Sequence, residues 1–269
     1  MITTILRLYA KIFAKKYFVK LNTMLYSMSI RGLGIYNYEN MEVSGESNFI
    51  KNHVLPRAKK KSKYIIFDIG ANKGEYSELV AKLPNVEVHS FEPHPATFEI
   101  LKENTKSIDN IKYYNVAVSN NFGKLKLFDY ASKDGSAHAS LNSEIFTTVH
   151  KSSIVSHEVD VTTVDIVVEK NKFEMIDFLK IDVEGYELAV LNGSIKTLEN
   201  KSISIVQFEF TQLNTTTRIF FKDFYELLSD NYSIYRLLPN GLLEIKQYDP
   251  TIQEIFGYQN YVAILKELE

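Results

Sequence analysis

The sequence contains no cysteine. Disulfide bonds, thiolate metal sites and a cysteine nucleophile are therefore all excluded. The absence is compatible with a reducing compartment, and we expect a cytoplasmic protein. Long apolar runs are missing as well, because no stretch approaches the ~20 consecutive apolar residues of a membrane span. The chain therefore shows no segment that is expected to cross a bilayer.

An excess of one charge is also missing. The 269 residues include 31 basic and 33 acidic side chains, which leave a formal net charge of -2. This balance gives no general argument for nucleic-acid binding, and the 17 tyrosines are scattered without a stacking array. With 45% hydrophobic and 24% charged residues, the composition is typical of a globular protein with one large domain, or one domain and an appendage.

Acidic residues are absent from the N-terminal segment, where the first acid is Glu39. Basic residues interrupt its apolar run, so it lacks the uninterrupted core of a signal peptide; they are Arg7, Lys11, Lys15, Lys16 and Lys20. Ile5, Leu8 and Ile12 recur at helical spacing and predict an amphipathic helix. Two interpretations stay open: a helix that packs on the domain or on a second subunit of a homodimer, or a helix that contacts an anionic membrane surface at the inner face of the membrane.

Strand and helix patterns alternate after the basic segment RAKKKSK (57–63), which we interpret as a solvated connector. We therefore expect an N-terminal helical extension over residues 1–60 and a catalytic domain over 61–269. Strands are predicted at 64–69, 86–92, 112–118, 178–183 and 203–210. Helices are predicted at 74–83, 94–105, 186–198 and 220–230. Strands separated by helices of this length indicate βαβ units and an open parallel sheet.

The end of the chain follows a different pattern. A hairpin is predicted over 233–248 around the turn PNG, with a final strand at 261–267. The expected fold class is thus α/β, a mostly parallel sheet with an antiparallel C-terminal hairpin. Residues 119–176 read as an irregular insertion, and a long insertion in such a domain is typically functional.

The segment IIFDIGANKGEYS (65–77) places a glycine-containing turn between a predicted strand and a predicted helix. Gly70, Asn72 and Gly74 are spaced two apart, but Glu75 stands where the dinucleotide fingerprint has its third glycine, and the Lys-Ser/Thr of a P-loop is missing. Asp68 before the turn would repel a phosphate and could accept hydrogen bonds from an ammonium group. Glu92, about twenty residues further on, can take both hydroxyls of a ribose.

A ribose, an amino-acid tail and no phosphate together describe S-adenosylmethionine. A tight turn with a purely structural role is the alternative for GANKG taken alone.

Five ordered segments resemble the FkbM-type methyltransferases over residues 64 to about 210. They are FDIGANKGEYS, FEPHPATFEIL, NVAVSN, TTVD and FLKIDVEGYELAVLNG. The resemblance implies a class I methyltransferase (Rossmann-like) fold with a seven-stranded sheet, and O-methylation of sugars or natural products. It also implies that the cofactor is held by Asp68, Gly70, Asn72, Gly74 and Glu92, with the backbone at Ala117 and Val118 beside the adenine.

Carboxylates at the ends of two predicted strands are the candidates for catalysis. Asp182 and Glu184 follow the fourth strand, and Glu209 ends the fifth, so adjacent strands would bring Asp182 and Glu209 together. Such acids can act as a general base or share Mg²⁺ or Mn²⁺, with Gln212 or Asn214 completing the ligand set. Alternatively, Asp182 orients the cofactor or caps the following helix, and Glu184 is a charge at that helix's N-terminus. Glu209 lies between two phenylalanines, where an unpaired acid is costly to bury.

His138, in the insertion, is the best catalytic candidate among the histidines, with a solvated loop histidine as the alternative. His94 is expected to border the adenine or cap the next helix. The leading prediction is an O-methyltransferase acting on a sugar or nucleotide-activated sugar. Its competitors are the same activity on a lipid or other small natural product, an NAD-linked oxidoreductase, and a non-catalytic cofactor-binding domain.

Overall fold

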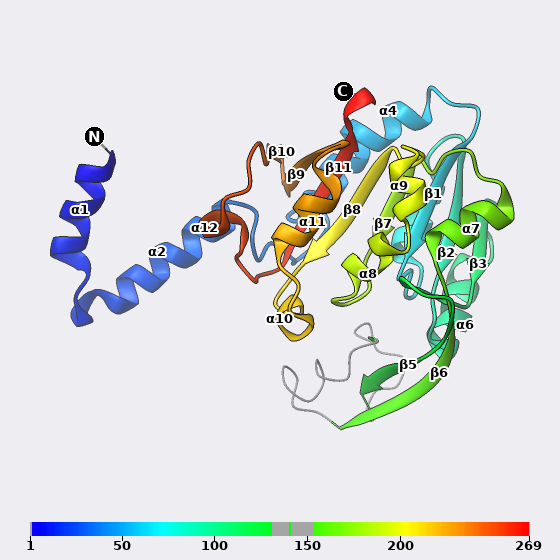
Figure 1. The fold of residues 1–269 in the computed structure, drawn as a ribbon, viewed down its shortest axis with the longest axis horizontal. Coiled ribbons are helices and arrows are strands. Elements are labelled where there is room, and N and C mark those ends of the chain that lie inside the picture. Colours follow the sequence, from blue (N-terminus) through cyan, green and yellow to red (C-terminus); the bar gives the residue numbers. More distant parts are fainter. Residues whose placement is uncertain (1, 131–139, 141–152, 269) are drawn as a thin grey trace.

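The computed structural model describes residues 2–130, 140 and 153–268. An eight-stranded sheet forms its centre, in the order β10-β9-β11-β8-β7-β1-β2-β3 (Figure 1). Its strands are β1 (Tyr64–Ile69), β2 (Val86–Phe91), β3 (Ile111–Tyr114), β7 (Phe178–Ile181), β8 (Ile205–Phe210), β9 (Tyr232–Leu238), β10 (Gly241–Glu244) and β11 (Gln259–Leu265).

Strand β11 lies antiparallel between β8 and β9, while β3, β2, β1, β7 and β8 run parallel. The predicted class I fold is confirmed, with β10 added to the expected seven strands at the edge of the sheet.

Helices cover both faces of this sheet. One face packs against α7 (Val164–Asn171), α8 (Glu187–Asn192), α9 (Ile195–Glu199) and α11 (Phe221–Leu228). The other packs against α3 (Glu46–Phe49), the π-helix η2 (Ile50–Val54), α4 (Leu55–Ala58) and α5 (Glu75–Ala81). Three further helices are α6 (Pro95–Thr105), α10 (Asn214–Thr217) and α12 (Pro250–Gln253), and the 3-10 turn η4 (Lys266–Leu268) follows β11. The helix expected over 186–198 is divided into α8 and α9 at Gly193.

Strand β1 shows why the central strands are apolar throughout. All six of its residues are buried, with Ile65, Phe67 and Ile69 in one core cluster and Tyr64 and Ile66 in the other. A strand covered on both faces needs this composition, since successive side chains point to opposite faces.

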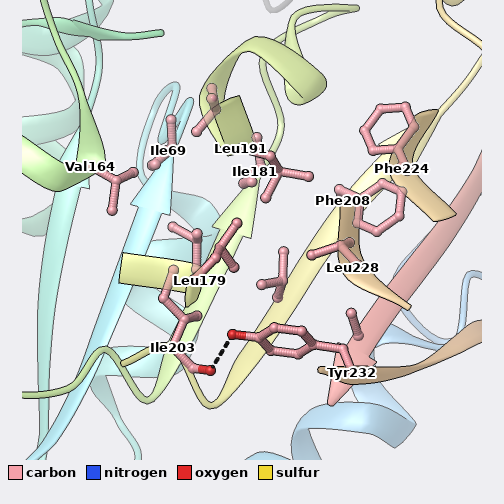
Figure 2. Packing of buried hydrophobic residues seen from close by; sticks show 14 of the residues in the cluster. Ile69, Val164, Leu179, Ile181, Leu191, Ile203, Phe208, Phe224, Leu228 and Tyr232 are labelled. Carbon is pink, nitrogen blue, oxygen red and sulfur yellow. Dashed lines mark hydrogen bonds between the residues drawn. The ribbon is translucent and has the colours of Figure 1, made fainter. Parts of the chain in front are cut away.

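Figure 2 shows the first cluster, in which side chains of β7 and β8 meet those of α8 and α11. At its edge the Tyr232 hydroxyl donates a hydrogen bond of 2.8 Å to the Ile203 carbonyl, which satisfies a buried polar group (Figure 2).

The strand predicted over 112–118 is wrong as a single element. It divides into β3 and β4 (Ala117–Val118), and β4 belongs to a second sheet, of order β4-β6-β5. Asn115 lies at the division, where its side-chain amide donates to the carbonyls of Glu92 at 2.8 Å and Pro93 at 3.1 Å. The amide side chain takes over bonds that a continued ladder would make, so the chain turns away from the main sheet.

The insertion over 119–176 is more regular than expected. Strands β5 (Gly123–Tyr130) and β6 (Ile154–Thr162) form a long antiparallel ladder, and α7 follows. Leu125 and Leu127 alternate with lysines, which is the period of a strand with one covered face. Ser140 forms a bridge with Phe128, so the insertion returns to this ladder.

The N-terminal segment forms two helices instead of one. They are α1 (Ile2–Phe13) and α2 (Val19–Gly32), joined by the 3-10 turn η1 (Lys16–Phe18). Both extend away from the sheet (Figure 1), and most of their large apolar side chains are exposed, so packing on the chain's own domain is wrong for this segment. Within residues 2–130, 140 and 153–268, no helix has both the length and the apolar character needed to cross a membrane.

Candidate active site

The turn after β1 lies at the point where the strand order reverses, between β2 and β7. Ligands of open α/β sheets bind at such points, beyond the carboxyl ends of the strands. The backbone N–H groups of Gly70 and Ala71 both donate to the Phe91 carbonyl, at 3.0 and 2.9 Å. These bonds fix the turn against the end of β2.

Gly70 and Gly74 are required by geometry. Gly70 has a φ of 81°, and a Cβ there would lie 1.8 Å from the Asp182 carbonyl oxygen. Gly74 has a φ of 89° at the N-terminus of α5, where a Cβ would lie 2.6 Å from Cδ1 of Leu101. Both positions combine left-handed backbone with close neighbours, and only glycine tolerates that. Asn72 between them is also left-handed, with a φ of 49°.

Glu92 is buried directly beside this turn. Its carboxylate accepts the N–H of Asn72 at 2.9 Å and the N–H of His94 at 2.8 Å. Burial raises its pKa to about 7, although these two backbone bonds act in the opposite direction. A ligand that donates hydroxyl groups to this carboxylate would favour the ionised form.

Glu92 lies in a cavity, here called the Glu92 cavity, whose empty volume is about 570 Å³ including its open mouth. Ala117 and Val118 line it as expected, and so do Gly70 and Asn72. The rest of its wall is largely apolar, from Ile69, Phe91, Pro93, Val116, Leu127 and Val183. Carboxylates of Glu92, Asp182 and Glu184 interrupt this apolar wall. A largely apolar cavity with carboxylates has the chemistry for a nucleoside: apolar contacts for the base and acceptors for the ribose.

Asp68 lies below the turn, outside the lining of both cavities described here. It is fully buried, and its Oδ2 accepts a hydrogen bond of 2.6 Å from the Ser77 hydroxyl. Its Oδ1 lies 3.7 Å from Nζ of Lys180. Burial raises the pKa of Asp68, and Lys180 opposes that shift. Its direct partners are thus Ser77 and Lys180.

Lys180 is a functional candidate that the sequence reasoning missed. Its Nζ lies 2.9 Å from Oδ2 of Asp182 and 4.7 Å from the centre of the Tyr76 ring. Burial alone would lower its pKa, but Asp182 and Asp68 hold the pKa above its ordinary value. A lysine inside an otherwise apolar buried strand was the available signal, because such a charge needs a partner.

A second cavity, here called the Glu209 cavity, adjoins the first. It is larger, about 1360 Å³ including open solvent, and both cavities are lined by Gly70, Asn72, Asp182 and Glu184. Its other lining residues are Tyr36, Tyr38, Glu209, Thr211, Gln212, Leu213 and Tyr258. Three carboxylates and three tyrosines therefore surround a space that opens onto the Glu92 cavity.

The expected proximity of Asp182 and Glu209 is present. Each lies one residue beyond the paired Ile181 and Phe208 of the parallel strands β7 and β8. Glu209 hydrogen-bonds with Tyr258, whose hydroxyl also accepts the side-chain amide of Asn260 at 2.9 Å. Burial, followed by the charge of Asp182, raises the pKa of Glu209 well above its usual range.

Glu184 lines both cavities from a left-handed backbone position, with a φ of 53°. Its carbonyl accepts a hydrogen bond of 2.9 Å from the Ser140 hydroxyl, which brings the insertion to the site. The charge at the start of α8 is Glu187, which accepts the N–H groups of Val183 at 3.2 Å and Gly185 at 3.0 Å. The suggestion that Glu184 is that helix charge is therefore wrong.

The carboxylates do not fit a divalent cation. In the part of the chain that the structure describes, no group of three or more His, Cys, Asp or Glu side chains could hold a metal ion. Oδ2 of Asp182 is paired with Lys180, and Oδ1 of Asn214 accepts the N–H of Thr211 at 2.8 Å. Both oxygens are thus engaged by donors that a metal ion would have to displace.

Two histidines are candidates for a role at the site, His94 and His138. His138 lies outside the described residues. His94 caps α6, where its side chain accepts the N–H of Thr97 at 3.4 Å. This confirms its expected capping role, while the neighbouring Pro93 lines the Glu92 cavity.

Known proteins resemble a large central part of this chain. A family model described as the Methyltransferase FkbM domain matches residues 68–235. The hexuronic acid methyltransferase AglP of Haloferax volcanii is 26% identical over 144 residues, which are 53% of this chain and 55% of that protein. The 2-O-methyltransferase NoeI of Sinorhizobium fredii is 28% identical over 145 residues, which are 50% of this chain and 58% of that protein.

The chain thus matches little more than half the length of these relatives. Among solved structures, SMU.1697c, a putative methyltransferase from Streptococcus mutans in complex with SAH, is similar with a TM-score of 0.41. That match has 10% identity and covers 79% of this chain and 95% of that chain.

Proposed function

The chain belongs to the FkbM methyltransferase family, and from this premise we propose that it transfers a methyl group from S-adenosylmethionine to a hydroxyl of a sugar. The observation that carries the proposal is the junction of the Glu92 and Glu209 cavities, which share Gly70, Asn72, Asp182 and Glu184. The Glu92 cavity has the chemistry of a nucleoside site, and the Glu209 cavity adds Glu209 and three tyrosines to the shared carboxylates. Methyl transfer needs this arrangement, because donor and nucleophile must meet at one place.

In the Glu92 cavity, Glu92 would accept hydrogen bonds from the ribose hydroxyls. The apolar wall that includes Val116, Ala117 and Leu127 would contact the adenine. When bound, S-adenosylmethionine supplies a sulfonium methyl group that an oxygen nucleophile can take. Gly70 lines both cavities, so its backbone would lie beside the ligand, whereas Gly74 packs against Leu101 and holds the shape of the turn.

In the Glu209 cavity, Glu209 would remove the proton of the acceptor hydroxyl. A carboxylate with a raised pKa is a stronger base than an exposed one once it is ionised, and burial gives Glu209 this property. Lys180 fixes the Asp182 carboxylate at the boundary of the two cavities, so Asp182 would orient the same hydroxyl. Asp68 and Tyr76 act through Lys180 as positioning residues.

A sugar suits the lining of the Glu209 cavity. Carboxylates accept hydrogen bonds from hydroxyl groups, and tyrosines add aromatic faces and further hydroxyls. Asp182, Glu184 and Glu209 would repel an anionic acceptor, so a neutral sugar is favoured over a hexuronate. The relative named as a hexuronic acid methyltransferase supports a sugar as the acceptor class, and the relative named as a 2-O-methyltransferase supports transfer to an oxygen.

The test is an acceptor panel assayed for S-adenosylhomocysteine by mass spectrometry. Separate reactions contain a neutral hexoside, a hexuronate glycoside, a nucleotide-activated hexose or a lipid alcohol. We expect sugar-dependent product, highest with the neutral hexoside and lost in Glu209→Gln. Turnover of the lipid alcohol with every sugar inert would contradict the sugar assignment. Failure of S-adenosylhomocysteine to bind in calorimetry would contradict the proposed donor.

A further inference from the structure

The two N-terminal helices, here called the N-terminal arm (residues 2–32), expose apolar side chains along their length. In α1, Ile5, Leu8 and Ile12 are exposed and share one face, while Arg7 and Lys11, four residues apart, lie beside that face. In α2, Leu21, Met24, Leu25 and Met28 repeat at helical spacing and are also exposed. Contiguous exposed apolar surface of this kind marks an interaction site.

The arm is a defined structure with a fixed corner. The Tyr9 hydroxyl donates to Oδ1 of Asn22 at 2.6 Å, and the Asn22 amide donates to the Phe13 carbonyl at 3.0 Å. The rings of Phe13 and Phe18 also meet edge to face, with centroids 5.0 Å apart. These contacts join α1 to α2 across the turn, so the apolar faces are presented by a two-helix unit.

The charge of the arm has one sign. Residues 1–38 contain six basic side chains and no acidic one, so the acid excess of the chain lies entirely beyond them. Lys15, Lys16 and Lys20 surround the corner and are exposed, and Tyr17 between them is 91% exposed. Lysine stems and tyrosine rings are amphipathic groups that suit a boundary between water and an apolar phase.

We propose that the N-terminal arm binds an anionic lipid surface, lying within its headgroup region without crossing it. Basic helices with exposed apolar faces bind such surfaces by combined burial and electrostatic attraction. Pairing with the arm of a second copy would bring like charges together, because neither arm carries an acid. Neither helix is long and apolar enough to span a bilayer, so the contact is peripheral.

The arm leads directly into the wall of the Glu209 cavity. Helix α2 ends at Gly32, and Tyr36 and Tyr38, which line that cavity, follow within a few residues. Tyr36 is fixed there by its backbone N–H, which donates to the Tyr258 carbonyl at 2.7 Å. Lipid contact by the arm would therefore bring the Glu209 cavity near the membrane surface.

The experiment is co-sedimentation of the full chain with vesicles. Vesicles of phosphatidylcholine alone are compared with equal mixtures of phosphatidylcholine and phosphatidylglycerol. We expect binding to the mixed vesicles only, weakened by salt. The double variant Lys15→Glu/Lys16→Glu should lower the partition coefficient at least about tenfold, since each near-surface basic residue contributes about fivefold.

A matched charge reversal serves as the control. Lys59→Glu/Lys60→Glu changes two adjacent exposed lysines after α4 and should leave vesicle binding unchanged. Ile5→Ser/Ile12→Ser should lower binding without lowering the melting temperature, because both side chains are exposed. Equal binding of the Lys15/Lys16 variant and the wild type would overturn the proposal. The proposal would also be overturned if the wild type did not bind vesicles and formed a dimer in sedimentation equilibrium that Lys15→Glu/Lys16→Glu dissociates.

Discussion

The Glu92 and Glu209 cavities are adjacent but are built in different ways. The Glu92 cavity comes mainly from residues 69–72, 91–93 and 116–118, which belong to successive turns of one βαβ series. The Glu209 cavity is lined by Tyr36 and Tyr38, by residues at the ends of β7 and β8, and by Tyr258. These residues come from segments that are far apart in the sequence. With the proposed assignment, cofactor binding would depend on segments close in the sequence, whereas acceptor recognition would depend on the assembly of distant segments.

The largest effect should come from the turn on which both cavities depend. Gly70→Ala places a Cβ 1.8 Å from the Asp182 carbonyl oxygen at a φ of 81°. Backbone strain and overpacking together should destabilise the fold by about 2–6 kcal/mol and abolish cofactor binding. Thermal unfolding and calorimetry measure the two losses.

Gly241→Ala is the control, because a Cβ at Gly241 meets nothing within 4 Å. It should leave the melting temperature and the cofactor affinity nearly unchanged. A Gly70→Ala protein with wild-type stability would show that the turn is not constrained as described.

The next effect separates the cavities by chemistry. Glu209→Gln and Asp182→Asn should each lower the methylation rate about 10²–10⁴-fold, the usual contribution of acid–base catalysis, with the affinity for S-adenosylhomocysteine retained. Single-turnover rates and calorimetry provide the two readouts. The double variant should lose less than the product of the two single losses, because residues that act as a unit are not additive. Wild-type rates in both single variants would place the chemistry elsewhere.

On the cofactor side, Glu92→Gln should weaken S-adenosylhomocysteine by about 1.5–3 kcal/mol, the scale of a hydrogen bond to a charged group. The single-turnover rate at saturating cofactor should change much less, since Glu92 would contact the nucleoside and not the acceptor. Calorimetric affinity and single-turnover rate again distinguish the two cavities. If Glu92→Gln lowered the single-turnover rate as much as Glu209→Gln does, the two cavities would not have separate roles.

Cofactor affinity should also depend on pH through Glu92. Burial raises its pKa to about 7, and hydrogen bonds from ribose hydroxyls would favour the ionised form. Below pH 7 the affinity should therefore fall with pH, by at most about tenfold per unit, and Glu92→Gln should remove this dependence. Calorimetry between about pH 5.5 and 8 would measure this pH dependence of the affinity, because the range includes the pKa of Glu92 at about 7.

Glu187 is the matched control, because burial raises its pKa to about 7 as well and it lines neither cavity. In the folded protein without ligand, both acids have pKa values above the unfolded value of 4.5. Their protonated forms therefore contribute to the free energy of unfolding below about pH 4.5, and this contribution is lost as the pH rises through 7. Glu187→Gln should change this stability profile and keep the pH dependence of affinity. Loss of both would contradict the role of Glu92.

The smallest effect should appear at the outer wall of the Glu209 cavity. Tyr38 contacts Tyr258 edge to face, with ring centroids 5.9 Å apart, and is 59% exposed. Tyr38→Ala should raise the KM for the acceptor about two- to tenfold, as expected for loss of an aromatic contact. The affinity for the cofactor should not change, and a shift in that affinity would show that the cavities are coupled.

The difference between the cavities also explains what the sequence could predict. The glycine turn, Glu92 and the parallel strands follow from short-range patterns: the spacing of the glycines, the alternation of strand and helix patterns, and the distance of an acid from the turn. The pairing of Lys180 with Asp182 could not be predicted from the sequence, because a lysine in a strand does not indicate which acid it contacts. The contribution of Tyr36 and Tyr38 depends on a contact with Tyr258, more than two hundred residues away. The length of residues 119–176 predicts an irregular insertion, although the alternating leucines of β5 are the signal for the β5–β6 ladder.

The Glu92 cavity is proposed to hold the nucleoside of the methyl donor. The most direct test is a crystal structure of the protein with S-adenosylhomocysteine. We predict both ribose hydroxyls within hydrogen-bonding distance of Glu92, with the adenine between Pro93 and Val118. S-adenosylhomocysteine bound elsewhere, or with its ribose away from Glu92, would contradict the claim.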